Sequence, residues 1–431
     1  MMGNNSAPTF LIILYRFLTW LLSPLAWVFL MLRAYGGKED MARLGERLGK
    51  YIVPRPNGTL VWLHGTSVGE SLVGLSLAKE MRKLRPDLRF LFTSTTITSA
   101  NIIAKSLIMG DVHQYVPVDT GSAVNRFLNH FTPDFAIFLE GEIWPNLILA
   151  TKSRGIKMAL VNARMTAKST GNWQKYPKTA AQLFGCFDYV HPADAQTKAA
   201  LESLGARNIA ECRNLKLAAP APSFSKGEVK TIAQSIGNRP IWLAASTHAG
   251  EEEIIIAAHK KILAIIPNAL LIIAPRHPVR ADEVFRLCTK FVKRRSLGQL
   301  PDKTTEIYLW DTIGELGNAF KLANISLMAG SLLPNIGGHN PIEPAQLGSA
   351  VISGKYIHNF QNIYDEMATK SAAIILKETS GEEIATSVGE LLLNQERRQA
   401  LMKAADLFAK SGSKTLGKVA AVLLTLIGGQ N

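Results

Sequence analysis

The chain has 431 residues, more than one hydrophobic core usually holds, which predicts two domains. Hydrophobic residues make up 47% of the chain and charged residues 19%, a balance that excludes an intrinsically disordered protein. An excess of 48 Lys and Arg over 34 Asp and Glu gives a net charge of +14, which favours an anionic partner: nucleic acid, an acidic bilayer surface or a phosphorylated substrate.

The first predicted element is the apolar stretch from Phe10 to Leu32, interrupted by Arg16 and Pro24. It has about the length that a helix needs to cross a bilayer. A cleavable signal peptide is disfavoured, because no basic segment precedes Phe10 and no small-residue cleavage site follows Leu32. We therefore expect a membrane anchor at residues 1–37.

The charges around this stretch predict its orientation. No charged residue precedes Phe10, whereas basic residues follow Leu32 at Arg33, Lys38, Arg43, Arg47 and Lys50. The positive-inside rule then places the rest of the chain in the cytoplasm. The many aromatic residues leave open a second arrangement, in which the stretch lies in the membrane interface without spanning it.

Two series of short apolar runs alternate with amphipathic stretches, which is typical of βαβ units around a parallel sheet. We expect an N-terminal Rossmann-like domain at 38–217, a hinge at 218–240 with the Pro-Ala stretch 218–223, and a C-terminal Rossmann-like domain at 241–431. The predicted strands are 60–63, 90–92, 135–139 and 158–161 in the first domain, and 241–244, 270–273, 307–309, 325–327 and 350–352 in the second.

The loop after the first strand contains His64-Gly-Thr-Ser-Val-Gly-Glu70. Ser67 and Glu70 have the S-x-x-E spacing of a capping box, which explains both residues without any function. The functional interpretation is that Gly65 and Gly69 let a substrate approach and that Glu70 acts as a general base for a hydroxyl. The spacing alone does not decide between the two.

Glu140-Gly-Glu-Ile-Trp-Pro-Asn146 follows another predicted strand. Two carboxylates one residue apart could bind a hard cation loosely, but we favour a structural role in which one glutamate caps the next helix and Pro145 starts it. Cations also follow apolar runs, at Lys216, at Arg276-His-Pro278 and at Lys355, so several could converge on a phosphate; any one alone fits a solvated surface charge. Ser246 to Glu252 follows the predicted strand at 241–244 and offers a binding site at a helix N-terminus; the alternative is a Ser/Thr helix cap with acidic first-turn residues.

The stretch Ala329 to Pro344 is the richest in turn residues and predicts a strand, a tight loop and a helix that starts near Glu343. Such a loop can hold an anion on free backbone N–H groups. Asn340 and Glu343 could face one crevice, with the carboxylate accepting from a ribose diol. The alternative is a glycine turn in which Asn340 is the N-cap.

Several common sites are excluded by the sequence. It contains no Walker A pattern, no GxGxxG after the first strand and no GxSxG elbow. Its cysteines, Cys186, Cys212 and Cys288, are far apart without a CxxC pair, which argues against a disulfide framework or zinc site and for a reducing compartment.

Taken together, the motifs resemble those of the lipopolysaccharide Kdo transferases, which move 3-deoxy-D-manno-octulosonic acid (Kdo) from CMP-Kdo to a lipid A precursor. The resemblance covers the chain from about Tyr35 to beyond Tyr364. It depends on seven motifs in the same order: 67–70, 140–146, Asn162-Ala-Arg164, 246–252, Pro275-Arg-His-Pro278, Asp311-Thr-Ile-Gly-Glu-Leu316, and Gly330-Ser331 through Gly337 to Glu343.

The resemblance implies a GT-B fold, in which two Rossmann-like domains face a cleft, with an N-terminal membrane anchor. It implies an inverting, metal-independent transfer without a cofactor, from CMP-Kdo to lipid IVA at the inner-membrane phospholipid surface, and no nucleic-acid partner. The positions that match the family's catalytic residues are Glu70 as proton acceptor, with Glu140 and Lys216 as transition-state stabilisers. Those that match its CMP site are Pro275, Arg276, Ile313, Gly314, Glu315, Asn340, Pro341, Ile342 and Glu343.

One position departs from the family pattern. An acidic residue usually follows the lysine by two positions, where this chain has Ala218, so the group that orients Lys216 can differ here. The competing hypotheses are another GT-B glycosyltransferase or a nucleotide-sugar epimerase and, in a different class, a membrane-tethered protein that binds nucleotide or nucleic acid without catalysis. The last is suggested only by the net charge.

Overall fold

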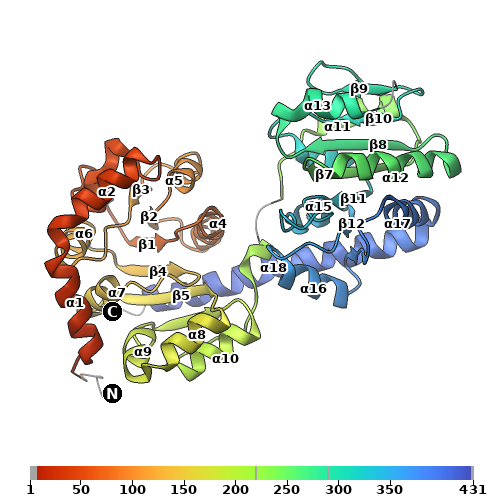
Figure 1. The fold of residues 1–431 in the computed structure, drawn as a ribbon. Helices are drawn as coiled ribbons and strands as arrows, with labels where there is room; N and C mark the ends of the chain where they lie inside the picture. Colours follow the sequence, from red (N-terminus) through yellow and green to blue (C-terminus); the bar gives the residue numbers. More distant parts are fainter. Residues whose placement is uncertain (1–6, 219–220, 289–290, 429–431) are drawn as a thin grey trace. The chain divides into compact units, whose positions relative to one another are not determined.

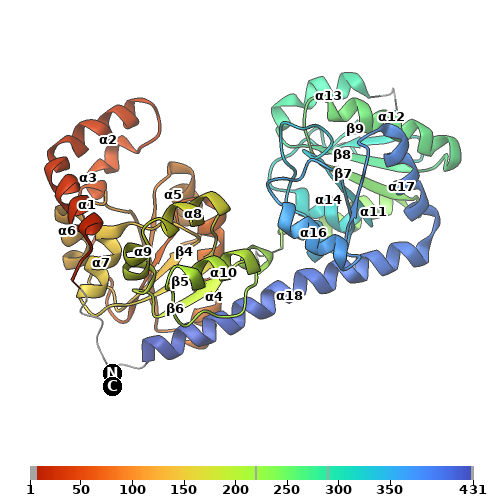
Figure 2. The same cartoon turned by 60° about the horizontal axis from the view of Figure 1, so that its bottom comes forward.

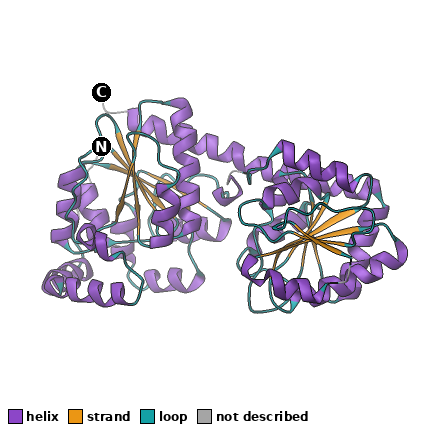
Figure 3. Ribbon diagram, turned by 90° about the horizontal axis from the view of Figure 1, so that it is seen from above, coloured by secondary structure: helices purple, strands orange, loops and turns teal. Residues whose placement is uncertain are grey.

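The computed structural model describes residues 7–218, 221–288 and 291–428. The chain forms two compact units (Figure 1): unit 1 comprises residues up to Ala219 together with those from Gly412 onward, and unit 2 comprises Pro220–Ser411. Each unit contains one parallel sheet between layers of helices (Figure 3). This is the expected α/β class with two Rossmann-like domains.

The sheet of unit 1 has six parallel strands in the order β3-β2-β1-β4-β5-β6. Alternate side chains enter two cores: Trp62 and Phe138 face Phe127 of one helical layer, whereas Val61 and Ile137 lie in the other core. Both faces are buried, which is why these strands are almost uninterrupted apolar runs. Their bounds are β1 Leu60–His64, β2 Arg89–Ser94, β3 Val112–Tyr115, β4 Phe135–Leu139, β5 Lys157–Ala163 and β6 Tyr189–Pro192.

The helices of unit 1 mostly connect successive strands. Five of the helices α1 to α10 start at a Ser, Thr or Asp side chain that accepts from a first-turn N–H: Ser67, Thr96, Thr120, Thr166 and Asp194. The bounds are α1 Phe10–Leu21, α2 Ala26–Tyr35, α3 Leu44–Arg47, α4 Val68–Leu84, α5 Ile97–Ala104, α6 Gly121–Phe131, α7 Pro145–Ser153, α8 Ala167–Gln174, α9 Pro177–Phe184 and α10 Ala195–Ser203, with short 3-10 turns η1 Ser23–Leu25, η2 Met41–Arg43 and η3 Leu215–Ala218.

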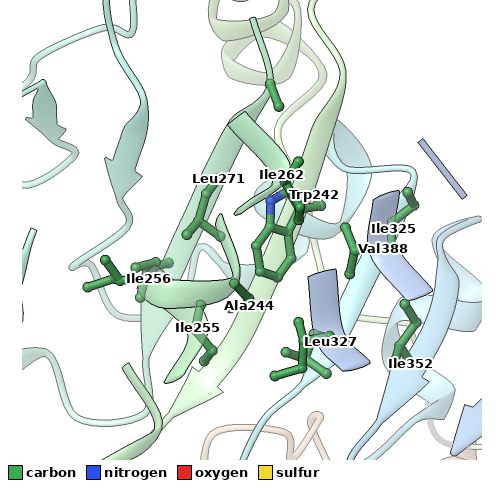
Figure 4. Close-up of a cluster of buried hydrophobic side chains, with 14 of the residues drawn as sticks. Trp242, Ala244, Ile255, Ile256, Ile262, Leu271, Ile325, Leu327, Ile352 and Val388 are labelled. Atoms are coloured by element: carbon green, nitrogen blue, oxygen red, sulfur yellow. The ribbon is translucent and has the colours of Figure 1, made fainter. Parts of the chain in front are cut away.

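The sheet of unit 2 has seven parallel strands in the order β13-β12-β11-β7-β8-β10-β9. Trp242 lies at the centre of the core on one face, where Leu271 and Leu327 of the neighbouring strands and Ile262 of α12 surround it (Figure 4). The bounds are β7 Ile241–Thr247, β8 Leu270–Pro275, β9 Val292–Arg294, β10 Ile307–Leu309, β11 Ile325–Met328, β12 Ala350–Ser353 and β13 Ile374–Ile375.

The helices of unit 2 cover both faces of this sheet. Helices α12 and α17 lie on the Trp242 side of the sheet, where Ile255 and Val388 join the core. The bounds are α11 Lys226–Ile236, α12 Glu251–Ile265, α13 Ala281–Leu287, α14 Leu316–Leu322, α15 Ile342–Gln346, α16 Gln361–Thr369, α17 Gly381–Leu393 and α18 Gln395–Gly428, with the 3-10 turn η4 Pro278–Arg280.

All nine predicted strands are confirmed, each within three residues at either end. The sequence did not predict β3, β6, β9 or β13. Three of these strands, β3, β9 and β13, contain only 4, 3 and 2 residues and lie at or next to a sheet edge, where one partner strand and partial exposure leave little apolar pattern.

The domain boundaries differ from those expected at both ends of unit 2. The expected hinge 218–240 contains helix α11, which belongs to unit 2, while residues 219 and 220 of that hinge lie outside the described residues. The long helix α18 (Figure 2) starts in unit 2, but its residues from Gly412 belong to unit 1. The reason is its apolar side chains Leu416, Val419 and Leu423, which are buried in the core against α4 and the first sheet.

The N-terminal apolar stretch forms a bent pair of helices. No single helix in the described part of the chain is long and apolar enough to cross a bilayer; α1 and residues Ser23–Tyr35 together have the length and composition, but they meet at a bend of 51°. Helix α1 is attached to the body of unit 1, because the Tyr15 hydroxyl donates to Asp119 (2.8 Å) and Asn146 donates to Thr19 (3.0 Å). The stretch is therefore part of unit 1.

Because the end of α18 completes the core of unit 1, Leu423→Ala should lower the free energy of unfolding of unit 1 by about 2–5 kcal/mol, the usual cost of truncating a buried leucine. Val422→Ala is the matched control, because Val422 is 40% exposed and should change it by about 0.5 kcal/mol or less. Hydrogen exchange of β1 and β4 amides measures the effect. Equal protection in both variants would show that the tail does not stabilise the sheet.

Candidate active site

Glu70 lies just beyond the carboxyl end of β1, in the first turn of α4. Ser67 is the N-cap of this helix, as predicted, since its Oγ accepts from the Glu70 N–H (3.2 Å). The Glu70 carboxylate does not complete a capping box with Ser67: its Oε2 accepts from the Thr66 N–H (2.7 Å) and from the Thr66 hydroxyl (3.2 Å). These bonds fix the buried carboxylate at the edge of the sheet, while Oε1 receives only a long contact of 3.3 Å from the same hydroxyl among the described hydrogen bonds.

Gly65 makes room for Glu70 itself. A Cβ at Gly65 would lie 2.9 Å from Cβ of Glu70 and 3.3 Å from a methyl of Leu139. Any larger residue would therefore displace the start of α4. The lack of a side chain at Gly65 thus seats the Glu70 carboxylate, and the approach of a substrate at Gly65 and Gly69 stays a prediction.

A second carboxylate lies close to Glu70. Burial raises the pKa of Glu142, and the negative charge of Glu70 raises it further. Glu142 follows β4, the direct neighbour of β1, so parallel pairing brings the two loops to one edge of the sheet. The structure thus brings together the 67–70 and 140–146 motifs.

Glu140, Asn162 and the turn that carries Lys216 form one hydrogen-bonded unit. The Asn162 amide donates to Glu140 Oε1 (3.3 Å), and its carbonyl oxygen accepts from the Leu215 N–H (2.8 Å) at the start of η3. Asn162 is fully buried, and both Glu140 (φ 61°) and Asn162 (φ 56°) have left-handed backbone angles at the ends of β4 and β5. The Lys216 side chain lies outside what the structure describes, but its backbone is in η3.

The expected glutamate cap of α7 is wrong. Helix α7 does begin at Pro145, but the carboxylate that accepts from its first N–H groups belongs to Asp119, which bonds to Asn146 N (3.0 Å) and Leu147 N (2.8 Å). Asp119, and not Glu140 or Glu142, thus supplies the carboxylate at the start of α7. Within the described residues, no three His, Cys, Asp or Glu side chains are grouped so as to hold a metal ion.

In unit 2 the glycine-rich loop after β11 is held by one buried carboxylate. Glu251, the first residue of α12, accepts from the backbone N–H groups of His248 (3.0 Å), Gly330 (2.8 Å) and Leu332 (2.9 Å). Burial raises the pKa of Glu251, although these three bonds oppose the shift. The Ser/Thr cap expected for this helix is wrong: the N-cap is Gly250, and Glu251 instead joins the loops after β7 and β11.

Histidines and an arginine gather at the same edge. The rings of His248 and His339 are stacked with centroids 5.2 Å apart and Nε2 atoms 2.9 Å apart, and His277 meets His248 edge-on at 5.8 Å. Burial, followed by the charges of His248, Arg276 and His277, lowers the pKa of His339 to about 4. Gly330 allows this packing, because a Cβ there would lie 2.8 Å from the His339 ring.

Asn340 and Glu343 lie side by side at the start of α15; that both face one crevice stays a prediction. The Asn340 amide donates to Glu343 Oε1 (3.3 Å), and its carbonyl oxygen accepts from the Ile342 N–H (3.1 Å). The N-cap position itself is taken by Pro341, one residue later than expected. Burial raises the pKa of Glu343, while Asn340 and the positive charge of Arg276 oppose the shift, so Arg276 and Glu343 share one environment.

The 313–315 segment is a turn at the same sheet's carboxyl edge, after β10. Ile313 is 85% exposed at its tip, which is unusual for isoleucine and leaves an apolar face open. Glu315 points back to the protein: it accepts from Arg295 Nε (3.0 Å) and from the Thr312 hydroxyl (2.8 Å). Burial alone would raise the pKa of Glu315, but these two partners lower it.

Sequence reasoning missed three residues of these two sites: Asn162, Glu251 and Asp119. Each is polar and strongly buried, and each ties together segments far apart in the sequence. Asn162 and Glu251 were part of recognised motifs, yet nothing in the motifs names their partners. Their signal is a polar residue within or directly after a buried strand, which requires a specific hydrogen-bond partner.

The two parallel Rossmann-like units define the fold class as GT-B, which glycosyltransferases and nucleotide-sugar epimerases share. A glycosyltransferase from Rickettsia africae has the same fold, with a TM-score of 0.57 and 13% identity over 87% of this chain and 100% of that one. The family model described as 3-deoxy-D-manno-octulosonic-acid transferase (kdotransferase) matches residues 42–219.

Two relatives extend the match over most of the chain. A 3-deoxy-D-manno-octulosonic acid transferase of Rickettsia bellii is 33% identical over 88% of this chain and 90% of its own. A probable mitochondrial transferase of the same name from Arabidopsis thaliana is 32% identical over 89% and 88%. The chain belongs to the Kdo transferase family.

Because three backbone N–H groups depend on Glu251, Glu251→Ala should destabilise unit 2 by about 3 kcal/mol or more, since each orphaned buried donor costs about 1–3 kcal/mol. Glu253→Ala, in the same helical turn but exposed, should cost about 0.5 kcal/mol or less. Calorimetry of both variants measures the difference. Equal transitions would mean that the loop holds its shape without the carboxylate.

Asn162→Asp should make unit 1 sensitive to pH. The aspartate keeps the acceptor for Leu215 N but turns a second carboxylate toward Glu140, and like charges raise the pKa of the pair in the folded state. A raised folded pKa means that stability is retained at low pH and is lost as pH rises above the usual carboxyl range.

The melting temperature of Asn162→Asp should therefore be near that of the parent at pH 4 and well below that of the parent at pH 8. The control is Asn57→Asp, at an exposed asparagine of unit 1, whose melting temperature should equal the parent's at both pH values. A melting difference that does not depend on pH would contradict the bridge between Asn162 and Glu140.

Proposed function

We propose that this glycosyltransferase moves Kdo from CMP-Kdo to lipid IVA, a lipid A precursor, in lipopolysaccharide biosynthesis. The acceptor hydroxyl oxygen attacks the anomeric carbon of Kdo, the bond from that carbon to the phosphate oxygen breaks, and CMP leaves with the electron pair. The attack takes place opposite the leaving group and inverts the anomeric centre. The observation that carries the proposal is the gathering of the family's motifs at the carboxyl edges of the two sheets.

Glu70 is the proposed general base. The hydroxyl proton passes to its carboxylate as the new bond forms. The two bonds from Thr66 orient the carboxylate in advance, so the reactive geometry does not have to be found at each turnover. Because Glu142 lies near, a carboxylate-rich environment surrounds Glu70 in this unit.

Glu140 and Lys216 are the proposed stabilisers of the transition state. Negative charge develops on the departing phosphate, and a positioned ammonium would stabilise it without a metal ion. Asn162 supports this role, since it connects the Glu140 carboxylate to the backbone of the turn that carries Lys216. This bridge is a candidate for what replaces the acidic residue absent at Ala218.

The proposed CMP site lies in unit 2, at Pro275, Arg276, Ile313–Glu315 and Asn340–Glu343. Arg276 supplies a cation for the phosphate, and Glu343 supplies an acceptor for the ribose diol. The exposed face of Ile313 suits the apolar face of a base. Glu315 holds the turn through Arg295 and Thr312 instead of reaching outward.

Attachment to the cytoplasmic face of the cell inner membrane is proposed through α1 and α2. Helix α1 turns polar groups toward unit 1, whereas large apolar side chains are exposed along both helices, among them Phe10, Phe17, Trp20, Trp27 and Phe29. Aromatic rings on such a face favour the membrane interface. Together with the bend of 51°, this supports a pair of helices that lies in the interface and does not span the bilayer.

If Glu70 is the general base, one conservative substitution at this position should greatly lower turnover. Glu70→Gln keeps an oxygen that can accept from Thr66 N but cannot take up the proton, so turnover should fall by about 100- to 10,000-fold while CMP-Kdo binding and the melting temperature stay near the parent's. Glu80→Gln, on the same helix, is the control and should keep full activity.

Transfer at more than about a tenth of the parental rate by a folded Glu70→Gln enzyme would return Glu70 to a purely structural role.

Competition binding tests the nucleotide of the donor: CMP should displace bound CMP-Kdo, whereas UDP should not. Preferential binding of UDP would favour another GT-B enzyme or an epimerase.

A further inference from the structure

Unit 1 contains an apolar pocket of about 280 Å³ on the inner side of helix α1. Two of its three hydroxyl-bearing side chains bond to groups elsewhere, Tyr15 to Asp119 (2.8 Å) and Thr179 to Thr9 (2.7 Å). The pocket therefore offers almost only carbon to an occupant. Its walls are Leu11, Ile12, Leu14, Tyr15 and Leu18 of α1, Pro145 of α7, Trp173 of α8, and Tyr176, Thr179 and Leu183 at α9.

The pocket opens beside the exposed apolar face of α1. Leu14 and Leu18, which line it, are themselves 37% and 43% exposed, and helical spacing puts Phe10 and Phe17 on the same face as Leu14, four residues before it and three after it. Trp173 also lines a second, small cavity, whose other walls include Glu140, Gly141 and Arg164. The two cavities therefore share the Trp173 side chain as a common wall.

The chemistry of the walls selects the occupant. A phosphate, a sugar or a charged side chain would lose its hydrogen bonds to water here and find none in return. A peptide segment would leave its backbone N–H and C=O groups unpaired for the same reason. A saturated hydrocarbon chain has no hydrogen bonds to lose and is stabilised by the burial of its methylene groups.

Positive charges near the pocket favour, among hydrocarbon-bearing occupants, a lipid with an anionic headgroup. Helices α8 and α9 carry the exposed lysines Lys168 and Lys178, and Lys175 follows the end of α8. Lysines beside an apolar pocket suit a phosphorylated headgroup whose chain is inserted next to them. The pocket volume is slightly below that of sites for drug-sized ligands, which fits part of a single chain.

We propose that this pocket binds one acyl chain of the acceptor lipid and so holds the acceptor sugar near Glu140. The proposal rests on the proposed function, in which the acceptor is an acylated lipid. When one acyl chain is bound in the pocket, the acceptor hydroxyl is held at a fixed height above the bilayer plane. Remote binding energy is then used to position the reacting group.

The test fills the pocket with a larger side chain and compares two acceptors that have the same sugar, one with acyl chains and one without. Leu14→Trp adds bulk inside the pocket, and Leu18→Trp is a second variant if the first does not fold. For the tetraacyl precursor in detergent micelles, KM should rise about tenfold, whereas KM for the fully deacylated precursor and for CMP-Kdo should not change. Leu84→Trp places the same side chain at another exposed leucine of unit 1, which is 57% exposed, and should behave as the parent with both acceptors.

A second readout does not depend on transfer. A tetraacyl precursor that carries a diazirine in one acyl chain should label peptides with Leu14, Tyr176 or Leu183 in the parent and lose this labelling in Leu14→Trp. If the parent labels these peptides but transfers no Kdo, the proposed function fails and the pocket stands. Labelling only at residues 20–35, an equal rise in KM for both acceptors, or a dimer that dissociates in Leu14→Trp would each overturn the acyl-chain proposal.

Discussion

Parallel strand pairing is the constraint on which the whole site depends. Every strand of both sheets runs in the same direction as its neighbours, so all loops that follow the strands of one unit meet at one edge. Glu70, Glu140 and η3 come together in unit 1 for this reason although about 145 residues of sequence separate Glu70 from Lys216. Arg276, Ile313 and Asn340 share the corresponding edge of unit 2.

Buried polar side chains then give these loops a fixed shape. In unit 1 the Asn162 amide joins two loops, and in unit 2 the Glu251 carboxylate joins two others through three backbone N–H groups. Glu140, Asn162 and Ser246, all at the ends of strands, have left-handed backbone angles of 61°, 56° and 61°. Such angles cost about 1–3 kcal/mol each and persist where surrounding bonds hold them, as these networks do. The geometry is thus set before a substrate binds.

The two sheets and the motifs that follow their strands could be predicted from the sequence, because strands buried on both faces are near-continuous apolar runs and the polar residues that follow them lie at one edge. The hydrogen bonds that hold these motifs in place could not be predicted. Asn162 meets a backbone group 53 residues away, and Glu251 looks like an ordinary acidic first-turn residue until its contact with Gly330, 79 residues away, is seen.

The packing of the end of α18 on unit 1 also could not be predicted, since an amphipathic pattern predicts a buried face but not the core against which that face packs. Similarly, the apolar stretch 10–32 predicted a membrane segment but not the bond from Tyr15 to Asp119 that attaches it to the domain.

The proposed transfer of Kdo from a CMP donor to an acylated lipid A precursor can be followed by mass spectrometry of the lipid, after incubation of the full chain with CMP-Kdo and the tetraacyl precursor in mixed micelles. We expect the precursor to gain the mass of one or more Kdo residues and CMP to be released in equal number. An unmodified precursor, with CMP-Kdo intact or merely hydrolysed while the same enzyme modifies the lipid from a UDP-sugar, would contradict this proposal.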